Sequence, residues 1–132
     1  MDEKLEKFQK LVNILTELRG EHGCPWDKKQ NHETLLKYLF EESEEYKQAV
    51  LNKDYDNMKE ELGDVLLQVI FHAQIAKENN KFDIYDVLDT INEKMIRRHP
   101  HVFGNSKAKT EEEIRQEWYR IKAEEKKCKE SK

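Results

Sequence analysis

Apolar residues recur every three to four positions along most of this chain of 132 residues, and few residues interrupt that pattern. Glycine occurs only four times and proline twice. An apolar period near 3.6 residues with few helix breakers is typical of amphipathic helices rather than strands. We therefore expect an all-α protein whose helices each bury one face in a helical bundle.

Capping residues and breakers divide the pattern into about five predicted helices. They cover about 2–19, 31–52, 55–79, 83–100 and 110–127. The segment Gly23-Cys24-Pro25-Trp26-Asp27 is predicted to be a loop, and His99 and His101 to flank a turn at Pro100. Without repeats or low-complexity linkers, we expect a single domain over residues 1–132, with residues 128–132 frayed or disordered.

Composition limits both the core and the partners of the chain. Charged residues make up 39% and hydrophobic residues 36%, so the core is thin and a second copy is expected to complete it. The formal charge of −4 gives no electrostatic footprint for nucleic acid, and no apolar run reaches membrane-spanning length. Cys24 and Cys128 lie too far apart to indicate a zinc site or a disulfide framework. With no signal-peptide pattern, we expect a cytoplasmic protein.

Acidic residues occupy core positions of the second predicted helix. Projected at about 100° per residue, Glu42 falls inside the apolar stripe and Glu45 falls on its edge. Glu44 points away from that stripe like an ordinary surface acid, and Glu41 lies beside it.

The third predicted helix repeats this anomaly. It is apolar over most of its circumference, which predicts burial on several sides, yet Glu61, Asp64, Gln68 and His72 share one narrow arc. We expect His72 to be a hydrogen-bonded core histidine. Gly63 lies on the far side of this helix, where the missing side chain would permit close approach of a neighbouring helix.

Two acid pairs, Glu42/Glu45 and Glu61/Asp64, thus face inward from consecutive helices. Residues three apart are neighbours on a helix, so each pair can offer oxygens to one cation. Hard oxygen ligands favour Mg²⁺ or Mn²⁺. The alternative is a solvated acidic face, or salt bridges to lysine.

A basic cluster ends the fourth predicted helix, where Lys94, Arg97 and Arg98 project from one side. These cations suit either a phosphate clamp or a simple interaction with the helix dipole. Trp26 and Trp118 could stack on a nucleotide base, but core packing is the expected role of both. A metal site beside a basic cluster would suit a nucleotide polyphosphate.

Several motifs resemble those of the MazG-like nucleoside triphosphate pyrophosphohydrolases. Glu41-Glu42-Ser43-Glu44-Glu45 followed by Glu61-Leu62-Gly63-Asp64 is similar to the family signature E-E-x-x-E…E-x-x-D. Cys24-Pro25-Trp26-Asp27 and the segment from Arg97 to Gly104 also resemble the family, so the likeness covers roughly residues 8–126. Many members carry two tandem copies, whereas this chain carries one, more similar to the N-terminal copy.

The resemblance implies an all-α enzyme that splits the α–β bond of a nucleoside triphosphate and gives the monophosphate and pyrophosphate. It implies Glu42, Glu45, Glu61 and Asp64 as metal ligands, with Glu41 in the outer part of the site. Nucleotide contacts are implied for Lys94, Arg97, Arg98 and Trp118. It also implies a homodimer or higher oligomer whose paired helices form a four-helix bundle. Two alternatives stay open: a pyrophosphatase for dUTP or phosphoribosyl-ATP, and a non-catalytic helical interaction module.

Overall fold

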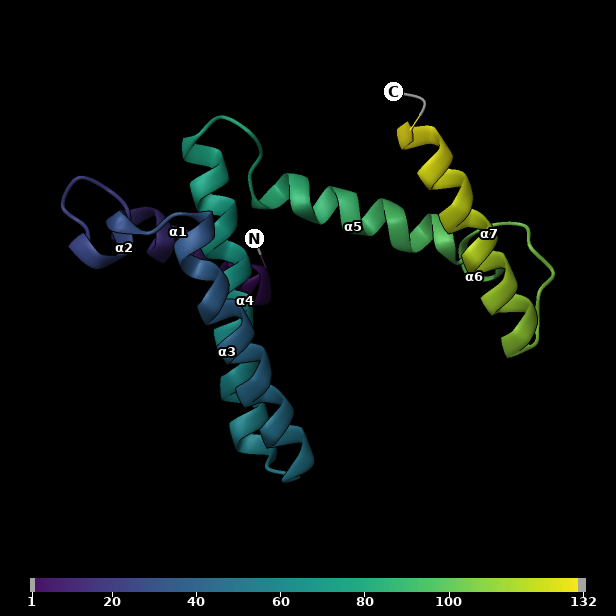
Figure 1. The fold of residues 1–132 in the computed structure, drawn as a ribbon, viewed down its shortest axis with the longest axis horizontal. Coiled ribbons are helices and arrows are strands. Elements are labelled where there is room, and N and C mark those ends of the chain that lie inside the picture. Colours follow the sequence, from purple (N-terminus) through teal and green to yellow (C-terminus); the bar gives the residue numbers. More distant parts are fainter. Residues whose placement is uncertain (1, 131–132) are drawn as a thin grey trace. The chain divides into compact units, whose positions relative to one another are not determined.

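The structure is a computed structural model that describes residues 2–130. Every regular element in that range is a helix, which confirms the predicted all-α class (Figure 1). The helices are α1 (Glu3–Leu18), α2 (Pro25–Lys29), α3 (His32–Leu51), α4 (Tyr55–Glu78), α5 (Ile84–Arg98), α6 (Pro100–Phe103) and α7 (Glu111–Glu130). None of the helices in the described range is long and apolar enough to cross a membrane.

The prediction of about five helices is wrong, because α2 and α6 form where a loop and a turn were expected. Each of these short helices has a proline at its start. Proline suits the first helical position because its fixed φ is already helical and its missing N–H would have no partner there. Helix α7 continues to Glu130, beyond its predicted end at about residue 127. The frayed or disordered tail over residues 128–132 stays a prediction. Residues 131–132 of that predicted tail lie outside the described residues.

By its internal contacts the chain divides into two compact units, Met1–Ile84 and Tyr85–Lys132. A single functional domain over residues 1–132 therefore stays a prediction.

The first unit is built on a hairpin of α3 and α4, which pack side by side (Figure 1). Asn31 caps α3: its side chain accepts from the Thr34 N–H at 2.9 Å while the Thr34 hydroxyl accepts from the Asn31 N–H at 2.9 Å. Asp54 caps α4 by accepting from the Asn57 N–H at 3.2 Å. Both long helices begin within one residue of their predicted starts at 31 and 55, and these caps fix where they begin.

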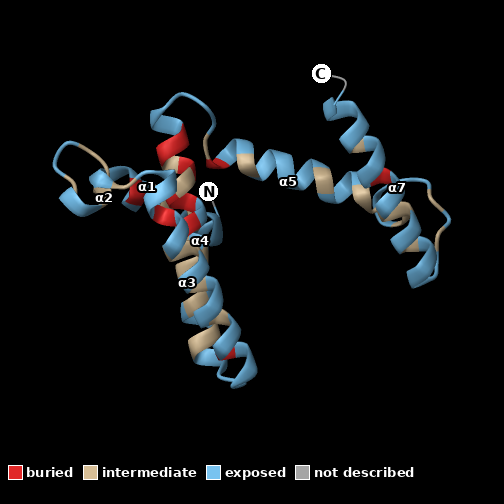
Figure 2. Cartoon of the chain, in the orientation of Figure 1, coloured by how far each residue is buried: buried red, intermediate tan, exposed pale blue. Residues whose placement is uncertain are grey.

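The core of the first unit lies where α1 and α3 cover α4 (Figure 2). Leu15, Leu35 and Ile70 are its largest fully buried side chains. The prediction that α4 is buried on several sides is confirmed for its C-terminal half, where the buried residues from Gln68 to Ala76 lie around the whole helix beneath α1 and α3. It is wrong for the N-terminal half of the helix in the single chain. An apolar strip of α4 stays exposed, with Leu62 at 49% and Leu66 at 42% exposure.

Arg19, at the end of α1, fixes the segment that leads into α3. Its guanidinium donates to the backbone carbonyl oxygens of Asp27 and Gln30, and it pairs with Glu78 at 2.8 Å. The same group lies over the Phe71 ring, 5.7 Å from the ring centroid. The side chain is only 8% exposed, so burial strengthens these charge-assisted hydrogen bonds.

The second unit contains most of α5 together with α6 and α7. Ion pairs between Arg97, Arg98 and Glu125 join α5 to α7. The predicted start of α7 is confirmed, since the Thr110 hydroxyl accepts from the Glu113 N–H at 3.2 Å. In this unit the Glu113 carboxylate accepts from the same hydroxyl at 2.9 Å, rather than completing a standard capping box.

Candidate functional site

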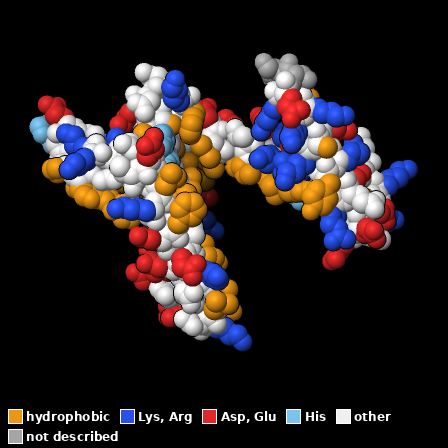
Figure 3. All heavy atoms as spheres, viewed as in Figure 1, with side chains coloured by type: hydrophobic (Ala, Val, Ile, Leu, Met, Phe, Trp, Pro, Cys, Tyr) orange, Lys and Arg blue, Asp and Glu red, His pale blue; other side chains and the backbone are white. Residues whose placement is uncertain are grey.

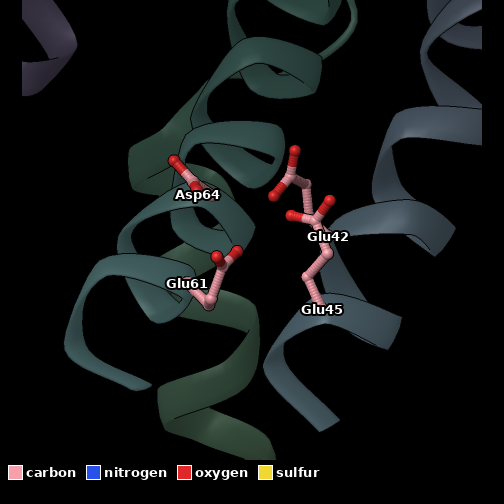
Figure 4. Close-up of side chains that lie close together, drawn as sticks. All are labelled: Glu42, Glu45, Glu61 and Asp64. Atoms are coloured by element: carbon pink, nitrogen blue, oxygen red, sulfur yellow. The ribbon is translucent and has the colours of Figure 1, made fainter. Parts of the chain in front are cut away.

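Four carboxylates from the α3–α4 hairpin converge on one point (Figure 4). Glu42 and Glu45 come from α3, and Glu61 and Asp64 come from α4. One oxygen of each residue lies within 4.8 Å of one oxygen of every other. The structure therefore brings together the two acid pairs that the helical period predicted. We call these four residues the acid cluster.

Crowding and burial disfavour negative charge in the acid cluster. Burial, followed by the charges of Glu45, Asp64 and Glu61, raises the pKa of Glu42 from 4.5 to about 7. Burial also raises the pKa of Glu61, with further contributions from a hydrogen bond to Glu45 and from that residue's charge. Glu42 and Glu61 therefore keep their protons to a higher pH than free carboxyl groups do.

The donor atoms of the acid cluster fit a hard divalent cation. Glu42 Oε2 and Glu61 Oε2 are buried, and within the described residues neither has a hydrogen-bond partner. Buried acceptors without a partner cost about 1–3 kcal/mol each, so an ion between them would relieve that cost. All four ligand groups are carboxylates, which suit Mg²⁺ or Mn²⁺ better than zinc.

The neighbouring acids of α3 do not join the acid cluster. Glu44 is exposed, as predicted, and its carboxylate accepts from the Gln48 side-chain amide at 3.1 Å. Glu41 is exposed as well. Its expected place in the outer part of the site stays a prediction.

The polar stripe on α4 continues beyond the acids. Gln68 is 7% exposed, and its Oε1 has no partner within the described range. His72 is half-buried, and its Nδ1 lies 2.8 Å from Nδ1 of His32, as expected for a hydrogen-bonded histidine. Burial and the nearby His32 lower the pKa of His72. The residues are 40 positions apart, so no local pattern indicated this pair.

In the second unit, the predicted basic cluster is partly neutralised. Arg98 donates to both Glu125 oxygens, the closest contact being 2.9 Å from Nε, and Arg97 Nη2 lies 3.2 Å from Glu125. The two arginines hold the pKa of Glu125 at about 2. Arg98 is 12% exposed, whereas Arg97 is 48% exposed. Arg97 is therefore the more accessible guanidinium, and Lys94 is half-buried with no ion pair to a described residue.

The two tryptophans differ in their surroundings. The Arg98 guanidinium lies 4.8 Å from the Trp118 ring centroid, and His99 packs edge-on against the same ring at 5.4 Å. Core packing is the wrong role for Trp26, which is 49% exposed and contacts the Tyr38 ring edge-on at 5.6 Å. The short helix α2 holds it at the surface of the first unit.

The helical hairpin and its carboxylates define a class of protein: an all-α protein with an oxygen-ligand site between two antiparallel helices. A sequence model of the MazG nucleotide pyrophosphohydrolase domain matches residues 30–103, which is more than half of the chain. The chain belongs to the MazG nucleotide pyrophosphohydrolase family.

Similar proteins support the same family. The nucleoside triphosphate pyrophosphohydrolase/pyrophosphatase MazG of Thermotoga maritima is 56% identical over 90% of this chain and 45% of its own length. The nucleoside triphosphate pyrophosphohydrolase of Escherichia coli K12 is 43% identical over 92% of this chain and 46% of its own length. These names describe hydrolases of phosphoanhydride bonds. The chain therefore spans less than half the length of these two relatives.

One solved structure shares the fold. The crystal structure of a mazG-related protein from Thermotoga maritima superposes with a TM-score of 0.72 and 33% sequence identity. The match covers 87% of this chain and 98% of that one.

Proposed function

We propose that this protein is a Mg²⁺-dependent nucleoside triphosphate pyrophosphohydrolase that cleaves the α–β phosphoanhydride bond. Water would add to the α-phosphorus, and pyrophosphate would leave with the bridging oxygen. The observation that carries this proposal is the acid cluster, in which one carboxylate oxygen of each residue lies within 4.8 Å of the others between α3 and α4. The relatives from Thermotoga maritima and Escherichia coli, both named as nucleoside triphosphate pyrophosphohydrolases, support the same substrate class.

Some residues of this chain would bind the metal ion, and others would bind the phosphates and the nucleotide. We assign Glu42, Glu45, Glu61 and Asp64 as ligands of Mg²⁺, with Mn²⁺ as a substitute. The bound cation supplies Lewis-acid polarisation and neutralises charge on the phosphates. Lys94, Arg97 and Arg98 would hold phosphate oxygens, and Trp118 would orient the nucleotide near Arg98. Glu41, exposed on α3 in the outer part of the proposed site, is the candidate to accept the proton of the attacking water.

A product analysis tests the proposal directly. The full chain is incubated with canonical and damaged triphosphates, with dUTP and with phosphoribosyl-ATP, in Mg²⁺ or in EDTA. We expect pyrophosphate and the monophosphate to accumulate only with metal. Release of orthophosphate from the γ-position would contradict the cleavage site. Preference for dUTP or phosphoribosyl-ATP would favour the related pyrophosphatases. No metal-dependent product from any substrate would favour the interaction module.

We propose further that a second copy of the chain covers the exposed apolar face of α4. Leu62, Leu66 and Val69 lie within two turns of one another and are between 39% and 49% exposed. Gly63 lies beside them, and a Cβ built there would meet no atom within 4 Å. The predicted close approach at Gly63 is therefore wrong within the single chain. A partner helix would explain both the glycine and the exposed face.

Replacing Gly63 with alanine distinguishes a monomer from this dimer. In a monomer the added methyl group meets open space, so G63A would raise stability by about 1 kcal/mol through helix propensity. In the proposed dimer the methyl group meets the partner helix, so we expect a lower melting temperature and weaker self-association. Light scattering and thermal unfolding at several protein concentrations measure both. A more stable variant with unchanged assembly would refute the dimer through this face.

A further inference from the structure

A basic pocket in the second unit is left unexplained by the acid cluster. Its cavity has a volume of about 460 Å³ and lies beside α7, with Arg98 of α5 in its wall. Three lysines of α7, Lys122, Lys126 and Lys129, line it with Arg98, against the single carboxylate of Glu125. Lysine and arginine side chains gather over this part of the unit in Figure 3. We call these three lysines the lysine row.

The spacing of the lysine row places its members on one face of α7. Positions separated by four and then three residues are neighbours on a helix. Seven residues advance a helix by about 10 Å, so the row extends along the helix rather than clustering at one point. An extended row of cations suits an extended anion better than a single small one.

The charges of the pocket are not balanced within the described chain. Glu125 is already paired with Arg97 and Arg98. No ion pair joins any member of the lysine row to a described carboxylate, although the whole protein carries a net charge of −4. Like charges four residues apart repel each other and destabilise a helix. An anionic ligand would offset this repulsion.

Glu125 also prepares one wall of the pocket. It holds the Arg98 guanidinium with contacts of 2.9 and 3.2 Å, while the Trp118 ring lies 4.8 Å away from that guanidinium. A fixed guanidinium loses little conformational freedom when a ligand arrives, whereas the exposed lysines adapt around it. The pocket thus combines a rigid cationic wall with flexible ammonium groups.

We propose that this pocket binds an oligophosphate anion through Lys122, Lys126 and Lys129. Phosphate oxygens accept strong charge-assisted hydrogen bonds from lysine, and each phosphate of an oligophosphate can meet a different lysine. Both the triphosphate group of a substrate and free pyrophosphate have this chemistry. This proposal rests on the proposed function in one respect: the proposed function is the reason for choosing phosphate rather than another anion as the ligand.

Binding in the absence of metal tests the pocket separately from hydrolysis. In EDTA, calorimetry measures the affinity of the full chain for inorganic triphosphate, pyrophosphate and orthophosphate at low ionic strength. We expect affinity to fall in that order, and K122Q/K126Q to weaken triphosphate binding at least tenfold. The matched control K107Q/K109Q removes the same charge from exposed loop residues of this unit and should change affinity by less than about twofold.

Equal losses in the two double variants, or no triphosphate binding by the native chain, would overturn the proposal. The proposal would also be overturned if the chain bound an oligonucleotide through the lysine row but did not bind triphosphate. Hydrolysis measured in parallel separates the two proposals. Lysine-dependent binding without any metal-dependent hydrolysis would refute the proposed function alone. Metal-dependent hydrolysis, together with triphosphate binding that is unchanged in K122Q/K126Q, would refute the proposed pocket alone.

Discussion

Replacing Glu61 with glutamine is expected to abolish metal-dependent release of pyrophosphate while making the metal-free protein more stable. Glu61 Oε2 is a buried acceptor without a partner in the described chain, and its carboxylate lies among three others. Losing one ligand weakens the charge stabilisation that the cation supplies, worth several kcal/mol, so turnover should fall by about 10³-fold or more. Removing one negative charge relieves repulsion, so the melting temperature in EDTA should rise by roughly 2–5 °C.

A loss of turnover together with a gain in metal-free stability distinguishes a metal ligand from a structural residue. The matched control is Glu44→Gln on α3, which removes an exposed carboxylate that accepts a hydrogen bond from the Gln48 amide. We expect E44Q to keep its turnover and its melting temperature. Turnover is followed by pyrophosphate release, and helical content by circular dichroism. If E61Q turns over normally, or if it unfolds in EDTA at a lower temperature than the native chain, the ligand assignment is wrong.

The metal-free protein is expected to lose stability as the pH rises from about 4.5 to about 7, and Mg²⁺ to restore it. The pKa of Glu42 is about 7 in the folded chain and 4.5 in the reference state. The folded protein therefore binds more protons than the unfolded chain in this interval, so stability falls as the pH increases. A cation needs the ionised carboxylates, so its binding releases protons and strengthens with pH.

The measurement is the difference in melting temperature between Mg²⁺ and EDTA at pH 5, 6, 7 and 8. We expect this difference to widen steadily with pH and to stay nearly constant in Glu42→Gln. His72 changes the stability in the opposite direction, because its pKa is lowered in the folded protein. Its contribution to folding stability is fully present above pH 6.5 and is lost as the pH falls. Comparison with E42Q removes that contribution. A difference that narrows with pH would contradict the raised pKa of Glu42.

Helical periodicity was sufficient to predict the acid cluster, because all four acids come from two long helices and short-range spacing fixes their faces. The starts of α3 and α4 were equally local and were predicted close to Asn31 and Asp54, which cap these helices. The pairing of Arg98 with Glu125 joins residues 27 positions apart, so nothing in either helix indicated it. The basic cluster was therefore assigned either to a phosphate clamp or to the helix dipole, whereas Glu125 neutralises part of it.

Other failures have different physical causes. The short helices α2 and α6 each begin at a proline. We expected these prolines only to interrupt helices, although proline is also favoured at the first helical position. Burial of α4 was inferred from its apolar circumference, but one chain supplies neighbours for only part of that surface. The open space beside Gly63 has the same cause. A periodic pattern shows that a face is apolar, but it does not show which molecule covers it.

The hydrogen bonds from Arg19 to the segment before α3 affect which substitutions this segment can accept during evolution. Its guanidinium binds the carbonyl oxygens of residues 27 and 30, and every amino acid presents the same oxygen there. Outward-facing side chains in this segment, such as that of Trp26, can therefore be exchanged without loosening the path of the chain. New ligand preferences can arise on this surface by substitution, while the architecture that carries them is inherited unchanged.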